Sequence, residues 1–278
     1  MIERNESWWA SIPVVFEFES RRAMTIPRMM WWCVLAFFPV AIILLLLTLP
    51  GSRDNTPEEL WQFFLFCLVP MLISMLGTFM WTSSAISSEL EGQSWIYLAV
   101  RPGGRMAVVF GKYLVAVAWV LPATLIGVTL SIVVLWVAGT ELTAEGSVFE
   151  TWFAITRLCF LSVPAYAAIY LVIGTIFTKR SMIVGVAYTL VFELVVSFVP
   201  ALINKFTIQY RLRSLFIEWG GIDTSQLDDS ILSATILGSE PPWIHVSVLA
   251  CYTLSLVVLS SWLVRQREYL VTTAGDMS

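Results

Sequence analysis

The sequence contains little charge. Only 13% of its 278 residues are Asp, Glu, Lys or Arg, whereas soluble domains carry about 25%. The hydrophobic fraction is 58%, and a single core in water does not absorb that much apolar surface. The formal net charge of −4 indicates no basic surface for nucleic acid. The composition predicts an all-α, polytopic membrane protein that has the lipid bilayer as a partner and binds no nucleic acid.

Histidine and paired cysteine are scarce as well. His245 is the single histidine, and the four cysteines lie in apolar runs without a CxxC pair. A metal site is therefore not predicted, and Cys67, Met71 and Met75 are read as packing residues in preference to a copper path. An intramembrane hydrolase is disfavoured too, because the lone histidine is accompanied by no GxSxG motif.

The chain also lacks a phosphate-binding loop. Its Gly111-Lys112 pair is followed by Tyr113, and Met106 occupies the position where the first glycine of GxxxxGK[ST] belongs. No cofactor is expected in this chain, and any ATP and magnesium it depends on would be bound by a different polypeptide.

Six long apolar runs are present. Roughly 20 helical residues cross about 30 Å of hydrocarbon, and each run is near that length or longer. They predict spans over about 29–49, 61–84, 108–137, 152–177, 182–203 and 243–264. These spans form one transmembrane domain over 29–264, with a link at 85–105, a long polar loop at 204–242 and a tail at 265–278.

Residues 1–28 mix apolar and charged side chains. Apolar residues recur at spacings near three and four, and acids and arginines lie between or after them. The pattern predicts an amphipathic helix in the membrane interface, although a short soluble arm is the alternative. We expect membrane-surface anchors at Trp8, Trp9, Arg21 and Arg22, and at Lys112, which precedes the third span.

Basic residues are distributed unevenly between the two sides. With the N-terminus inside, eleven of the 16 Lys and Arg fall on the inner side. The positive-inside rule then predicts cytoplasmic N- and C-termini in a multi-pass protein of the cytoplasmic (inner) membrane. The 85–105 link is cytoplasmic in this topology, and the 204–242 loop lies on the outer side.

The 85–105 link is polar but carries an incomplete apolar stripe. A short helix parallel to the membrane is predicted, ending at Arg101-Pro102-Gly103-Gly104, because Pro and paired Gly stop regular structure. Two interpretations stay open on spacing alone. The helix either rests on lipid, or docks in a groove of another protein.

The link also resembles the signature of type-2 ATP-binding-cassette (ABC) permeases. The carriers of the resemblance are Glu-x-x-Gly at 89–92, Arg101-Pro102-x-x-Arg105, and Gly111-Lys112 six positions later. The resemblance implies a cytoplasmic coupling helix that contacts a separate ABC ATP-binding subunit, with either Glu89 or Glu91 as the motif acid. The residues expected at that interface are Ser88, Glu89, Glu91, Gly92, Ser94, Trp95, Arg101, Pro102 and Arg105.

Glu193 is the one acid deep inside a predicted span. Carboxylates within the bilayer are costly and often functional, so Glu193 is a candidate for a translocation path together with Thr78 and Met75. The alternative is a structural role, as a protonated acid or as an acid bonded to a Ser, Thr or Tyr hydroxyl on a neighbouring helix.

The function that the sequence favours is the membrane-spanning permease subunit of an ABC exporter. It would act with a second permease copy or paralogue and with two ATPase chains, and it would not be an enzyme itself. The alternative is an ion-coupled secondary transporter that uses Glu193. The substrate is not readable from the sequence, since the class is chemically broad.

Overall fold

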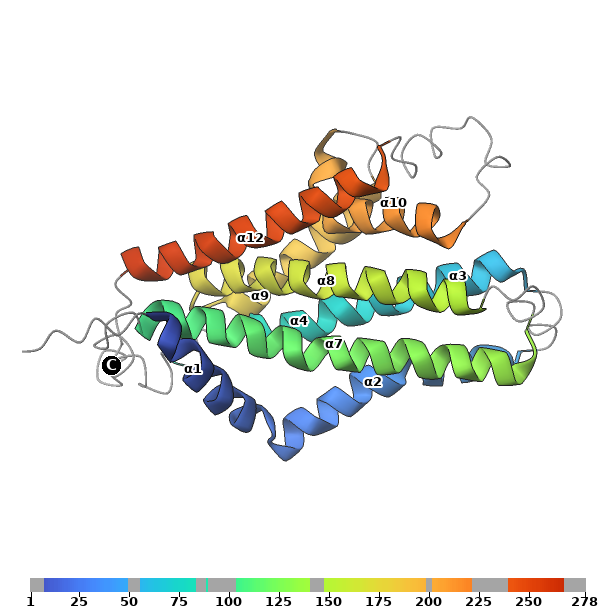
Figure 1. Cartoon of the computed structure of the whole chain (residues 1–278), viewed down its shortest axis with the longest axis horizontal. Helices are drawn as coiled ribbons and strands as arrows, with labels where there is room; N and C mark the ends of the chain where they lie inside the picture. Colours follow the sequence, from blue (N-terminus) through green and yellow to red (C-terminus); the bar gives the residue numbers. More distant parts are fainter. Residues whose placement is uncertain are drawn as a thin grey trace, which may run out of the picture.

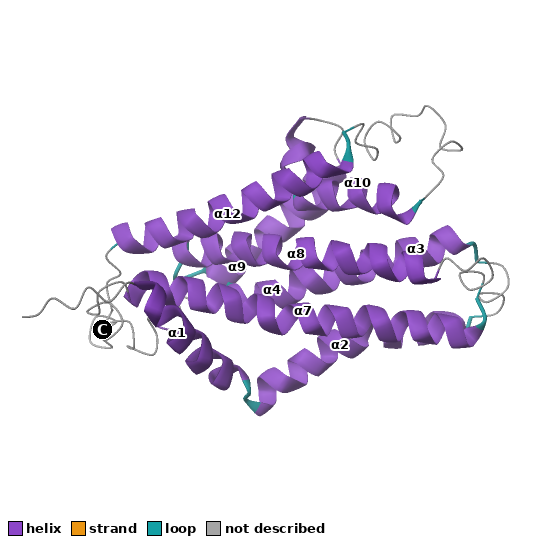
Figure 2. Cartoon of the chain, viewed as in Figure 1, coloured by secondary structure: helices purple, strands orange, loops and turns teal. Residues whose placement is uncertain are grey.

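The computed structural model of the chain describes residues 8–49 (side chains from residue 11), 56–83, 89, 104–140, 148–198, 202–221 and 240–267. Every element within these ranges is helical, and they contain no strand (Figure 2). The all-α prediction is confirmed for these residues. Within the described ranges, five helical stretches are long and apolar enough to cross a membrane: Ile26–Leu47, Glu58–Thr82, Gly104–Ala138, Val148–Ile176 and Pro242–Gln266.

The first two helices form a V that lies against α7 (Figure 1). Two residues, Met24 and Thr25, separate helix α1 (Trp8–Ala23) from helix α2 (Ile26–Leu47). Pro27 lies in the first turn of α2. Proline is tolerated there because its missing N–H has no helical partner in any case. The Trp32 indole of α2 donates a 2.7 Å hydrogen bond to the Trp119 carbonyl of α7 (Gly104–Ala138).

The second span is assembled from three consecutive pieces. Helix α3 (Glu58–Phe66) continues into a π-helical segment, η1 (Cys67–Ile73), and then into α4 (Ser74–Thr82). Pro70 lies within η1. Because proline removes a backbone donor and crowds the preceding turn, a locally widened helix accommodates it. The three pieces therefore form one continuous helical stretch that runs in one direction.

Helix α8 (Val148–Ile176) lies at the centre of the bundle. In the most apolar 18-residue stretch of α8, 72% is buried inside the protein. The corresponding share is 28% for α2 and 22% for α12 (Pro242–Gln266). One core cluster joins α8 to α12, α10 and the second span, and a second joins it to α2, α3 and α7. The exposed apolar faces of α2 and α12 are therefore among those available to lipid or to another subunit.

The fifth apolar run, predicted as one span over 182–203, is not a single regular α-helix. It consists of α9 (Ser181–Tyr188), the π-helical η3 (Thr189–Val195), the 3-10 turn η4 (Val196–Phe198) and, after a gap in the described residues, the 3-10 segment η5 (Leu202–Phe206). The 15 residues to Val195 rise about 22 Å. This length is short of about 30 Å of hydrocarbon, so this run is not among the five long spans.

The 204–242 region contains a packed helix, α10 (Ile208–Gly220). Thr207 caps its first turn by accepting a 3.2 Å hydrogen bond from the Tyr210 N–H, and Gly221 ends it in the left-handed conformation. Its apolar side, with Ile208, Leu212 and Phe216, is buried in the core beside α8. The long polar loop predicted at 204–242 therefore includes a packed helix.

Candidate functional site: a charge cluster around Glu89

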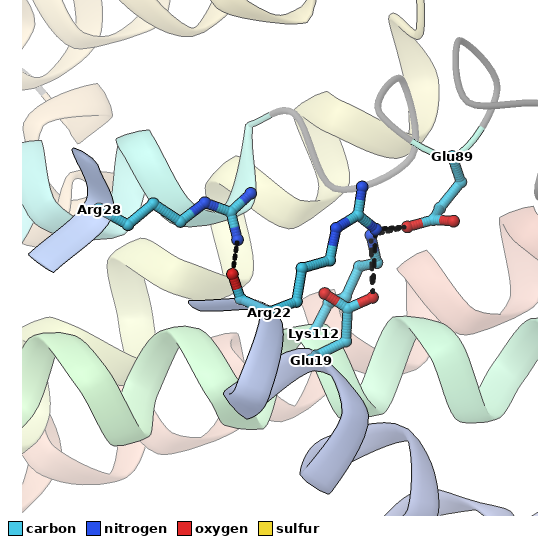
Figure 3. Close-up of polar contacts among 5 residues, drawn as sticks. All are labelled: Glu19, Arg22, Arg28, Glu89 and Lys112. Atoms are coloured by element: carbon cyan, nitrogen blue, oxygen red, sulfur yellow. Dashed lines mark hydrogen bonds and ion pairs between the residues drawn. The ribbon is translucent and has the colours of Figure 1, made fainter. Parts of the chain in front are cut away.

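Four charged side chains from three separate parts of the chain lie together (Figure 3). The Oε1 atom of Glu89 accepts hydrogen bonds from Arg22 Nη1 of α1 at 2.9 Å and from Lys112 Nζ of α7 at 2.7 Å. Glu19 Oε1, also on α1, lies 3.6 Å from Lys112 Nζ and 3.9 Å from Arg22 Nη1. We call these four residues the Glu89 cluster.

The cluster is buried but balanced in charge. The Glu89 and Lys112 side chains are 3% and 8% exposed, Glu19 is 12% exposed, and only Arg22 is substantially open at 41%. Two acids face two bases, so no charge is left uncompensated. Breaking a buried pair costs more than forming it gains, because the remaining ion keeps its desolvation penalty. The cluster therefore fixes how its three segments fit together more than it adds net stability.

Gly111 explains how α1 comes close enough to α7 for these contacts. A Cβ at position 111 would lie 2.5 Å from Val15 Cγ1 and 3.0 Å from Val15 Cβ. Glycine is thus the residue that allows the two helices to cross at this distance. Lys112 follows directly, while Glu19 and Arg22 lie one and two turns after Val15 on α1. The Gly-Lys pair of the sequence is a helix-crossing site followed by its ion-pair partner.

The beginning of the link is held by a second close approach. A Cβ on Gly174 of α8 would lie 2.7 Å from the Ser83 carbonyl oxygen and 3.1 Å from that of Thr82. These two residues close α4 immediately before the link. Thr82 also donates a 2.7 Å bond to the Thr78 carbonyl. The chain therefore leaves α4 from a position fixed by α8, and Glu89 is held six residues later.

Glu193 belongs to a different polar arrangement. Its Oε1 accepts a 2.7 Å bond from the Tyr188 hydroxyl, and its Oε2 accepts a 3.1 Å bond from the backbone N–H of Gln209 in the first turn of α10. An acid suits that position because the N-terminal end of a helix is electropositive. In return, Arg213 of α10 donates a 2.7 Å bond to the Ser197 carbonyl at the end of η4. These bonds join the broken fifth run to α10.

A family profile described as "ABC-2 family transporter protein" matches residues 27–196. The match covers more than half of the chain. The chain belongs to the ABC-2 transporter family. It is therefore a multi-pass membrane permease of the ABC transporter class, as the resemblance implied, and the family implies association with an ABC ATP-binding subunit. The search of curated proteins gives no match.

The ABC-2 profile spans the link, but the structure describes only part of the predicted interface. Glu89 is buried in the cluster, and Arg105 lies in the first turn of α7. The other predicted interface residues lie outside the described residues: Ser88, Glu91, Gly92, Ser94, Trp95, Arg101 and Pro102. Their contact with an ATPase stays a prediction.

The five predicted membrane-surface anchors have different surroundings. Arg21 is exposed and paired with Glu17 at 2.6 Å. Arg22 and Lys112 are engaged with Glu89, and the Lys112 ammonium is buried, which favours a packing role over contact with lipid phosphates. Trp8 and Trp9 belong to α1, and their side chains lie outside the described part. The anchoring roles remain predictions.

The three residues predicted for a translocation path are all buried inside this subunit. Met75 packs in the core beside α8, Thr78 donates to the Ser74 carbonyl at 2.7 Å, and Glu193 is fully enclosed. A path role for them stays a prediction. Glu193 is bonded to a tyrosine hydroxyl, as the alternative interpretation expected. Its partner, Tyr188, lies five residues earlier in the same helical run and not on a neighbouring helix.

Two contributors were missed by the sequence reasoning. Glu19 stands three positions before Arg22, a spacing that places both on one side of a helix, so the signal was available. Gly174 carried no comparable signal, because an isolated glycine in an apolar helix does not reveal which carbonyl it approaches.

Proposed function

We propose that this ABC-2 permease subunit is part of an exporter in the cytoplasmic membrane, powered by a separate ATP-binding subunit that holds ATP and magnesium. In this proposal the 85–105 link is the cytoplasmic coupling helix. ATP-driven closure of the ATPase pair displaces the link, and the Glu89 cluster passes that displacement to α1 and α7. The observation that carries the proposal is the single Glu89 oxygen bonded to both helices.

The contacts support transmission of a link displacement to α1 and α7, because each connection is either a buried ion pair or a close helix crossing. Glu89 is bonded to two cations from different helices, and Gly111 keeps those helices in direct contact. A shift of the link therefore has to move α1 and α7 with it or break buried ion pairs, which is costly. Packed interfaces respond to such displacements by moving as units.

Assembly with a second permease copy or paralogue is the next part of the proposal. The α9–η3 run presents a broad apolar face, with Ile183 at 68% and Val195 at 60% exposure. Because this face is apolar and exposed, it is available for pairing with another subunit. Six crossings with cytoplasmic termini, including this short run, agree with the distribution of basic residues.

The test is co-expression with a candidate ABC ATP-binding subunit from the same organism, followed by co-purification and ATP turnover in nanodiscs. We expect a stable complex in which Glu89→Gln assembles but loses most of the ATP-dependent conformational response. Glu17→Gln is the matched control, because Glu17 forms an exposed pair on α1, the helix that carries Arg22. Failure of the wild-type chain to bind the ATPase would refute the proposal, and a normal response in Glu89→Gln would refute the role of the cluster.

A further inference from the structure

A cleft of about 480 Å³ lies between η5, the first turn of α10 and the first half of α12. Helices α10 and α12 pack beside each other there (Figure 1). The volume is within the range of small-molecule sites, roughly 300–1,000 Å³. Lys205, Ile208, Arg211, Val248 and Leu249 are among the residues that line it.

The cleft has two chemically distinct parts. One wall is apolar and is built from Ile208 together with Val248 and Leu249 of α12. The other part carries the cations of Lys205 and Arg211. Arg211 is nine-tenths buried, whereas the Lys205 side chain is 42% exposed. A ligand that fits both parts needs an apolar body and an anionic end.

The charges in this region do not cancel. Glu240 is the carboxylate that faces both cations: its Oε1 accepts a 2.9 Å bond from Lys205 Nζ, and its Oε2 accepts a 2.6 Å bond from Arg211 Nη1. Arg211 also donates through Nε to the Lys205 carbonyl at 3.0 Å. Among the residues that the structure describes here, one acid against two bases leaves a single positive charge beside the apolar wall.

His245 adds a hydrogen-bond donor but no compensating charge. Its Nδ1 lies 3.0 Å from Arg211 Nη1. Since a guanidinium only donates, Nδ1 accepts, and the imidazole is neutral with its proton on Nε2. That Nε2 is buried and has no partner among the described residues. His245 stands on the same side of α12 as Val248, Leu249 and Tyr252, at helical spacings of three, four and seven.

We propose that this cleft binds an anionic phospholipid of the surrounding bilayer, with its phosphate at Lys205 and Arg211 and an acyl chain along Val248 and Leu249. A zwitterionic lipid brings its own cation against the residual positive charge. A free anion leaves the apolar wall unused. Basic pockets between membrane helices suit anionic head groups for the same electrostatic reason. This inference concerns lipid binding alone and does not rest on the proposed coupling to an ATPase.

The experiment is native mass spectrometry of the purified chain titrated with phosphatidylglycerol or phosphatidylcholine of identical acyl chains. We expect phosphatidylglycerol to bind about tenfold more tightly at one site, the effect of one or two charge-assisted hydrogen bonds. Inorganic phosphate should compete only weakly, because it lacks the acyl chain. Equal affinity for the two lipids, or full competition by inorganic phosphate, would overturn the proposal.

Two variants locate the site. Lys205→Gln leaves Arg211 and Glu240 as a neutral pair and should abolish the preference for phosphatidylglycerol, while Lys179→Gln, an exposed lysine elsewhere, should keep it. Val248→Trp places a bulky side chain in the cleft and should remove the tight site. Leu254→Trp, at a 66% exposed position of the same helix, should not. Folding is checked by the thermal midpoint of each variant. If the folded control variants lose the preference as much as Lys205→Gln and Val248→Trp, the lipid binds elsewhere.

Discussion

At the scale of single residues, Glu89 connects parts of the chain that are far apart in sequence. Its carboxylate meets Arg22, 67 positions earlier, and Lys112, 23 positions later. Both contacts go to one oxygen atom, so the two helices share the same point of attachment. Lys112 is buried and depends on this acid and Glu19 for its compensating charge.

Replacement of Glu89 by Gln should therefore destabilise the subunit. The change leaves Lys112 and Arg22 facing a neutral amide, and we expect the unfolding free energy in detergent to fall by about 2 kcal/mol. This is less than a fully buried pair would lose, because Arg22 is half-open to solvent. Glu17→Gln should change it by less than about 1 kcal/mol. Equal losses in the two variants would mean that burial of Glu89 carries no energetic weight.

Glu240 gives a prediction about pH. Hydrogen bonds from Lys205 and Arg211 hold the pKa of Glu240 at about 2, below its ordinary value of 4.5. A lowered carboxyl pKa stabilises the folded state above the unfolded value and loses that contribution as the pH falls through the folded value. The stability advantage of the wild type over Glu240→Gln should be constant above about pH 4.5 and shrink toward pH 2.

Thermal midpoints measured from pH 7 downward check this prediction. Glu218→Gln, which alters an exposed acid on α10, serves as the matched control and should follow the wild type at each pH. An advantage that disappears already near neutral pH would show that the Lys205–Glu240–Arg211 contacts do not form in the membrane-embedded protein.

At the scale of elements, the α1–α7 crossing depends on the absence of a side chain at Gly111. In Gly111→Ala the new methyl group meets Val15 at 2.5 Å, so α1 has to move away. We expect a loss of about 1–3 kcal/mol and faster hydrogen exchange in α1. The double variant Gly111→Ala/Val15→Ala should recover much of this, because it removes the nearest clashing atom. Absence of recovery would place the strain elsewhere.

Substitutions of Glu193 test whether this residue mainly connects η3 to α10. If Glu193 mainly holds the first turn of α10, Glu193→Gln should be tolerated, because its amide oxygen still accepts a hydrogen bond from the Gln209 N–H. Glu193→Leu should be clearly less stable, since it leaves that N–H and the Tyr188 hydroxyl without their acceptor. Proton-driven transport that requires no ATP and is lost in Glu193→Gln would instead support the secondary-transporter alternative.

The five long spans were predictable for a simple reason: lipid demands continuous apolar helices, and hydropathy reports them directly. The division of the fifth run into α9, η3 and η4 was not predictable, because its residues are as apolar as those of a full span and the bond between Glu193 and α10 is a tertiary contact. The Glu89 cluster was partly visible. The residue types stood out in the sequence, but the pairing of Lys112 with Glu89 in place of lipid phosphate is a tertiary contact.

At the scale of the whole molecule, the α1–α7 crossing and the bundle around α8 are two parts of one packed body, because α2, α3, α7 and α8 share a core (Figure 1). The link leaves the bundle at Ser83, held by Gly174, and Glu89 joins it to α1 and α7. A displacement of the link therefore acts between these two parts. This arrangement makes α1 an element that should respond to the nucleotide state of a bound ATPase.

Hydrogen exchange of the permease–ATPase complex tests this account most directly, and it needs no knowledge of the substrate. Protection of α1 and of the first turns of α7 is compared between nucleotide-free and vanadate-trapped complexes. We predict a nucleotide-dependent change in both segments for the wild type and for Glu17→Gln, and its loss in assembled Glu89→Gln. An unchanged response of α1 and α7 in Glu89→Gln would contradict the central role given to the Glu89 cluster.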